Sequence, residues 1–164
     1  MFILGLILGL ETDTGQQCPY WFTKTDSKLF CNYMFFEHLW QTGNDPDVVG
    51  MLKEHFGLDV EPMLKVASED LSLEDWLAEG YGDEVGWRKQ MEVNKAAWQS
   101  PQELVQCLQA FIQALDNSPD VFRRLGVSER YFVEGYFKQD LVDLLSMVEW
   151  ARNIGVRQVR LSMG

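Results

Sequence analysis

The sequence has few basic side chains. It carries 14 Lys and Arg residues against 25 Asp and Glu residues over 164 positions, which gives a formal net charge of −11. A surface that holds the phosphates of a nucleic acid needs clustered cations. We therefore expect no nucleic acid among the partners of this chain.

Cysteine is also scarce. The three cysteines, Cys18, Cys31 and Cys107, have neither the spacing of a zinc site nor the even count of a disulfide framework. This usage is typical of a reducing compartment, so we expect a cytoplasmic location. We expect no metal and no other cofactor.

Long hydrophobic runs are missing as well. The opening run, Phe2 to Leu10, is nine residues long, whereas a membrane helix needs about 20 apolar residues. No Lys or Arg precedes the run and no small-residue cleavage site follows it, so we predict neither a secretion signal nor a membrane span. The odd-numbered and the even-numbered residues of this run, which would lie on opposite faces of a strand, are all apolar. This is typical of a strand that is covered on both faces.

The last residues alternate in the same way. Val159, Leu161 and Met163 share one face of a predicted terminal strand, and Arg160 lies on the other. We expect the opening strand to pair with this one, with Leu6 and Leu8 buried beside Val159 and Leu161. Residues 20–23 predict a further strand, which would form a hairpin with the opening run.

Most of the remaining sequence has the 3.6-residue period of helices. Ser72 with Asp75 and Ser100 with Glu103 are capping boxes, and Gly80, Gly82 and Gly86 indicate an acidic loop. Helices are predicted over 28–40, 46–56, 73–77, 85–99, 101–115, 119–126, 128–136 and 139–154. The sequence thus predicts one α+β domain over residues 1–164, mostly helical, packed on a small antiparallel sheet made of the N-terminal hairpin and the C-terminal strand.

The negative charge is concentrated in one segment. Residues 44–84 hold twelve acidic side chains and only Lys53 and Lys65 as cations, a net charge of −10. One interpretation is a solvated acidic face. The other is a surface that attracts a basic protein.

The second interpretation gives a functional hypothesis: a non-enzymatic interaction domain that docks on a basic partner. Immunity proteins of nuclease toxins, and inhibitors that mimic nucleic acid, use this charge complementarity. Aromatic side chains among the acids would be the anchors. The candidate partner-binding residues are Asp70, Glu74, Asp75, Trp76, Glu79, Tyr81, Asp83, Glu84 and Trp87.

The alternative is a metal- or thiol-dependent enzyme or ligand-binding domain. Both histidines follow a glutamate, in the pairs Glu37–His38 and Glu54–His55, and these could share a metal if their helices met. The tetrapeptide "CPYW" at Cys18 is similar to the C-P-Y-C of glutaredoxin-like sites but lacks the second cysteine. The sequence has no G-x-S-x-G, P-loop or G-x-G-x-x-G motif, so no catalytic residue is assigned.

A third possibility is an accessory subunit. In that case the apolar edge of the sheet would join copies of the chain into a homo-oligomer, which the mass in solution would test.

Overall fold

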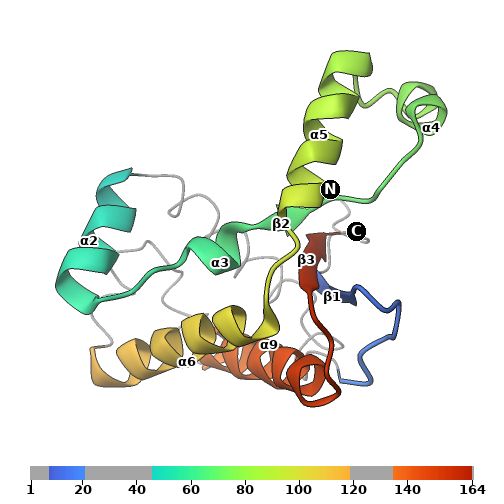
Figure 1. The fold of residues 1–164 in the computed structure, drawn as a ribbon. Coiled ribbons are helices and arrows are strands. Elements are labelled where there is room, and N and C mark those ends of the chain that lie inside the picture. Colours follow the sequence, from blue (N-terminus) through green and yellow to red (C-terminus); the bar gives the residue numbers. More distant parts are fainter. Residues whose placement is uncertain (1–7, 21–45, 119–134, 164) are drawn as a thin grey trace.

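The computed structural model describes residues 8–20, 46–118 and 135–163 (Figure 1). Its elements alternate between short strands and helices of varied length. In chain order they are β1 (Leu8–Thr12), α2 (Pro46–Phe56), α3 (Glu61–Leu64), β2 (Val66–Ala67), α4 (Leu73–Ala78), α5 (Glu84–Ala96), α6 (Pro101–Asn117), α9 (Tyr136–Asn153) and β3 (Val159–Met163). The predicted α+β architecture is confirmed.

The first and last described strands are neighbours, as the sequence predicts. β1 and β3 are antiparallel, with Leu10 opposite Leu161 and Thr12 opposite Val159. Leu8 and Leu161 are both fully buried. Leu6 lies outside the described residues.

The sheet is mixed, because its third strand is not the predicted hairpin strand. β2 pairs with β3 in parallel, with Val66 opposite Leu161, and the strand order is β1-β3-β2. Tyr20, the only described residue of the predicted hairpin strand, lies outside any strand, and the other three residues are outside the described ranges. Two residues of β2 are too few to give an alternating pattern, so the sequence offered no signal for this strand.

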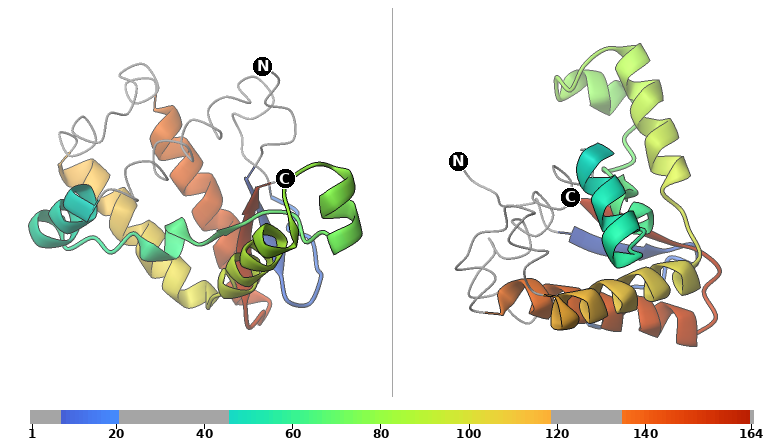
Figure 2. Two further views of the ribbon diagram at one scale, coloured as in Figure 1. Left: turned by 90° about the horizontal axis from the view of Figure 1, so that it is seen from above. Right: turned by 90° about the vertical axis from the view of Figure 1, so that its left-hand side faces the viewer.

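The core lies between the sheet and the pair α6 and α9, which run side by side beneath it (Figure 2). The fully buried residues of α6 have the predicted helical spacing. Phe111 of α6 and Phe137 of α9 approach with ring centroids 6.1 Å apart. The residues that form this layer include Leu104, Leu108, Phe111, Leu141, Leu144 and Val148.

Helix ends follow the sequence signals closely. Pro101 occupies the first turn of α6, and the Ser100 side chain accepts from the N–H of Gln102. Gly57 and Gly155 follow α2 and α9 with φ of 62° and 83°, a region that favours glycine. The predicted helices over 28–40, 119–126 and 128–136 fall almost entirely outside the described residues.

On the side of the sheet opposite α6 and α9, a helical hairpin projects from the molecule (Figures 1 and 2). It consists of α4, the connecting loop and α5, and we call residues 72–96 the arm. The arm leaves the sheet after β2, and the chain returns at Gln99, which forms an isolated bridge with Val159 of β3. The last part of the acidic segment, residues 72–84, therefore forms α4, the loop and the start of α5 in this projection, while its earlier described residues lie in and around α2, α3 and β2.

Candidate functional site

The arm is built by strong local signals. Ser72 caps α4 by accepting from the N–H of Asp75 at 3.1 Å, as its capping box predicts. The loop that follows is shorter than predicted, since Gly86 lies inside α5. Asp83 ends this loop by accepting from the N–H of Gly86 at 2.8 Å, so it caps α5.

The arm buries few side chains between its two helices. No side chain of α4 is fully buried, and in α5 only Asn94 is. Trp76 lies against Gly82, where an added Cβ would stand 3.5 Å from the indole Nε1. Trp87 is half-buried and its indole N–H donates to the Leu71 carbonyl at 2.8 Å. These two indoles hold the helices together, and the outer faces of both helices remain in solvent.

Tyr81 is exposed yet held in place. The residue is 62% exposed, and its ring centroid lies 5.4 Å from that of Trp76. The Tyr81 N–H donates to the Trp76 carbonyl, and Gly80 beside it has a φ of 75°. The loop therefore presents an aromatic ring whose backbone is already fixed.

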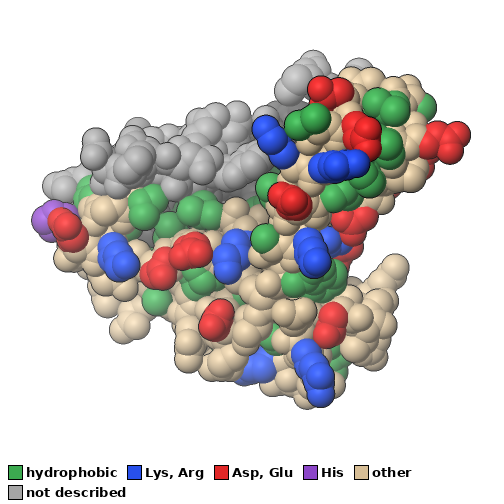
Figure 3. All heavy atoms as spheres, turned by 45° about the horizontal axis from the view of Figure 1, so that its top comes forward, with side chains coloured by type: hydrophobic (Ala, Val, Ile, Leu, Met, Phe, Trp, Pro, Cys, Tyr) green, Lys and Arg blue, Asp and Glu red, His purple; other side chains and the backbone are tan. Residues whose placement is uncertain are grey.

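Further apolar side chains of the arm are exposed. Leu77 is 52%, Val85 60% and Val93 52% exposed. Together with Tyr81 they are four of the six large hydrophobic side chains that are exposed in the described ranges. Figure 3 shows hydrophobic side chains on the projecting arm, interspersed with acidic ones.

Charge on the arm is segregated along its length. Between residues 72 and 86 there are five carboxylates and no Lys or Arg, and all five are exposed: Glu74, Asp75, Glu79, Asp83 and Glu84. The cations Arg88, Lys89 and Lys95 come later in α5, nearer the sheet. Arg88 pairs with Glu84 at 2.8 Å. We call residues 72–86 the tip of the arm.

The structure separates the nine predicted residues into three groups. Six are exposed at the tip, namely Glu74, Asp75, Glu79, Tyr81, Asp83 and Glu84. Trp76 and Trp87 are half-buried between the helices. Asp70 lies where the chain leads into the arm, and its carboxylate binds Arg160 at 2.7 Å.

Arg160 is the residue that sequence reasoning missed. Strand alternation placed it on the opposite face from Leu161, but it is 4% exposed because the base of the arm covers that face. Its guanidinium binds Glu11 at 2.8 Å, lies 4.7 Å from the ring centroid of Trp98 and donates to the carbonyl of Asn94. A lone arginine within an alternating strand gave no signal for these partners.

The ionisation of this cluster follows from its contacts. Burial lowers the pKa of Arg160, but its bonds to Glu11 and Asp70 outweigh burial and raise it overall. The hydrogen bond from Arg160 lowers the pKa of Asp70, with help from the Asn94 amide. The pair is therefore fully ionised at neutral pH.

The residues of the metal hypothesis are not brought together in the described chain. Glu37 and His38 lie outside the described residues, and Glu54 and His55 are exposed on α2. Over residues 8–20, 46–118 and 135–163, no group of three or more His, Cys, Asp or Glu side chains could hold a metal ion.

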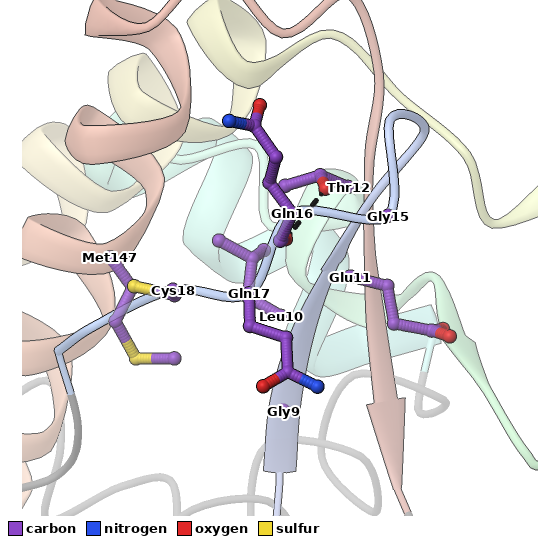
Figure 4. Close-up of a pocket in the computed structure, with 9 residues that line it drawn as sticks. All are labelled: Gly9, Leu10, Glu11, Thr12, Gly15, Gln16, Gln17, Cys18 and Met147. Atoms are coloured by element: carbon purple, nitrogen blue, oxygen red, sulfur yellow. Dashed lines mark hydrogen bonds between the residues drawn. The ribbon is translucent and has the colours of Figure 1, made fainter.

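A cavity of about 440 Å³ lies between β1, the turn after it and α9. Figure 4 shows Cys18 and Met147 on one side of it and Glu11 on the other, with the Thr12 hydroxyl donating to the Gln16 carbonyl at 2.7 Å. Burial raises the pKa of the Cys18 thiol, which disfavours the thiolate that a nucleophile requires. Glu11 is held by Arg160, so these lining residues do not form a catalytic arrangement.

Comparison with protein-family models, curated proteins and solved structures finds no significant match to this chain. Among the described helices, none combines the length and the apolar character that crossing a membrane requires. The functional argument therefore rests on the geometry of the arm.

Proposed function

We propose that this chain is a protein-interaction domain whose arm docks on a basic partner. The observation that carries the proposal is the composition of the tip: Leu77, Tyr81 and Val85 are exposed among five carboxylates, with no cation in the same segment. Nuclease toxins that an immunity protein would neutralise are the partner class suggested by the sequence, and an inhibitor of a basic enzyme belongs to the same proposal.

The apolar side chains would supply the affinity of such a complex. Binding hot spots are enriched in aromatic residues that lose little conformational entropy on binding. Tyr81 fits this role, since its ring lies against that of Trp76 at an interplanar angle of 41° and its N–H is already bonded. Leu77 and Val85 would extend the buried contact on either side of it.

The carboxylates would supply steering and selectivity. A surface of one sign accelerates association with a partner of the opposite sign and repels partners of its own sign. Because such steering is screened over roughly 8 Å at physiological ionic strength, association should slow as salt is added. The same charge repels the phosphates of nucleic acids.

Two charge-reversal variants test the proposal. Asp75→Lys/Glu79→Lys reverses two carboxylates at the tip. Asp13→Lys/Glu54→Lys makes the same change in net charge at two exposed positions away from the arm, and serves as the matched control. Both proteins are first checked for native circular dichroism and thermal unfolding.

Each protein is immobilised and used for affinity capture from an extract of its native cells, at low salt and at about 0.15 M salt. We expect the wild type and the control to retain the same basic protein, more at low salt, and the tip variant to lose it. Tyr81→Ala should reduce the free energy of binding to the retained protein by about 2 kcal/mol or more. The salt dependence of binding should not change. Equal capture by the tip variant and the control would refute the proposal.

A further inference from the structure

Arg160 contacts both chain connections of the arm. Its Nη2 lies 2.7 Å from Asp70, two residues before the arm begins. Its Nη1 donates to the carbonyl of Asn94 in the last turn of α5, and its guanidinium stacks on Trp98, two residues after the arm ends. The segments that lead into and out of the arm thus converge on one side chain.

The same guanidinium is anchored in the sheet. Arg160 belongs to β3, and its Nε donates to Glu11 of β1 at 2.8 Å. The neighbouring residues Val159 and Leu161 are held by backbone pairing to β1, while β2 and Gln99 also pair with β3. Arg160 therefore connects the most constrained strand of the sheet to the base of the arm.

A second buried polar side chain completes this base. Asn94 is fully buried, and its amide oxygen accepts from the backbone N–H of Ser68 at 2.9 Å and from Gln90 at 3.0 Å. Its amide nitrogen donates to Asp70 at 3.1 Å. Polar bonds of this kind are directional, so together they favour one orientation of α5 on the sheet.

Hydrophobic packing contributes less to that orientation, because the apolar side chains of the arm are at most half-buried. Apart from Asn94, no side chain of α4 or α5 is fully buried, so the arm shares little of the core that joins α6 to α9. We propose that Arg160 is a positioning residue: by bridging Glu11, Asp70, Asn94 and Trp98 it sets the angle at which the arm projects, and so where the tip meets its partner. This inference rests on the proposed function for its consequence, but the geometry itself can be tested without a partner.

The primary variant is Asp70→Ala, which removes the link between Arg160 and the segment leading into the arm. Asp70 has a side chain that is 56% exposed, so the fold should tolerate its loss. The matched control is Glu84→Ala, which removes a carboxylate of nearly equal exposure, 53%, from the ion pair with Arg88 inside the arm. Arg160→Met, which keeps an unbranched apolar stem but removes the guanidinium and every polar bond that it makes, is the stronger second variant.

Residual dipolar couplings of backbone N–H groups give the orientation of the arm relative to the sheet with α6 and α9, which we call the body. In the wild type and in Glu84→Ala, couplings from α5 should fit the alignment tensor of α6 and α9. In Asp70→Ala, and more so in Arg160→Met, we expect couplings of α5 to shrink or to require a rotated tensor, while helical chemical shifts persist. If the α5 couplings of Asp70→Ala still fit the wild-type tensor, the inference is wrong.

Partner binding then separates this inference from the proposed function. The control for binding is Asp116→Ala, which removes a carboxylate of similar exposure, 50%, from the ion pair with Lys138 outside the arm. If the arm of Asp70→Ala reorients and its affinity for the captured basic protein falls while that of Asp116→Ala does not, both stand. If the arm reorients but the wild type retains no partner through its tip, the proposed function fails and the positioning role of Arg160 remains. Unchanged affinity in a variant with a reoriented arm would overturn the link between Arg160 and docking.

Discussion

At the scale of single residues, burial raises the pKa of both cysteine thiols that the structure describes. Cys107 is buried in α6, where its thiol lies 3.2 Å from the Asp59 carbonyl, and Cys18 is half-buried against the core. Burial, followed by the negative charge of Asp59, raises the pKa of Cys107 to about 12. Both thiols are therefore protonated at neutral pH, which fits a structural role.

The first prediction concerns Cys107. In native protein at about pH 8, alkylation of Cys107 by iodoacetamide should be at least about a hundredfold slower than in the unfolded chain, because alkylation requires the thiolate. Cys18, which is more exposed, should react faster than Cys107. Peptide mapping by mass spectrometry measures both rates, and equal labelling of Cys107 in native and unfolded protein would contradict its burial.

Arg160 shows where sequence reasoning stops at this scale. The alternation of β3 identified the buried Val159 and Leu161 correctly, because an apolar face is recorded in the strand itself. The burial of Arg160 depends on Asp70 and Asn94, which are distant in sequence and become neighbours only through the fold. No local pattern carries that information.

At the scale of elements, helix caps have different consequences in the body and in the arm. Ser100 begins α6, whose buried face forms much of the core, whereas Ser72 begins α4, which has no fully buried residue. A cap bond contributes about 1 kcal/mol in either place. The element that it supports decides whether global or local stability changes.

The second prediction compares these caps. Ser100→Ala should lower the free energy of global unfolding by about 1 kcal/mol. Ser72→Ala should leave global unfolding nearly unchanged, but should speed amide hydrogen exchange in α4, since weakly packed units open on their own. Denaturant unfolding and hydrogen exchange measure the two effects. A Ser72→Ala variant with the global loss expected of Ser100→Ala would show that the arm unfolds together with the core.

Elements with strong local signals were predictable. The capping box and apolar stripe of residues 101–115 predicted α6, and Ser72 predicted the start of α4. β2 was missed because two residues carry no period, and its pairing with β3 spans nearly a hundred positions. For the site, the acidic and aromatic composition of the tip was visible in the sequence, but its projection away from the sheet was not.

At the scale of the whole molecule, negative charge and acid stability are linked through Asp70. Its pKa in the folded protein lies below its ordinary value of 3.8, because Arg160 donates to the ionised carboxylate. The unfolded chain therefore binds this proton first as the pH falls. The stabilisation is present above that value and is lost as the pH falls through the lowered pKa.

The third prediction follows from the lowered pKa of Asp70 in the folded protein. The free energy of unfolding of the wild type should decrease as the pH falls below about 5 and through 3.8 toward the lowered pKa of Asp70, and Asp70→Ala should show a smaller decrease over this range. Glu84→Ala, whose ion pair is at the surface, should follow the wild type. Urea unfolding at several pH values measures this difference. An unchanged pH profile in Asp70→Ala would mean that its bond to Arg160 contributes nothing to stability.

The central claim is that the partner binds at the tip of the arm. The most direct measurement is amide hydrogen exchange of the chain, alone and bound to the basic protein that it captures. We predict new protection in residues 72–86, with α6 and α9 unchanged. Protection confined to the body of the molecule, with the tip exchanging as in the free chain, would contradict the account.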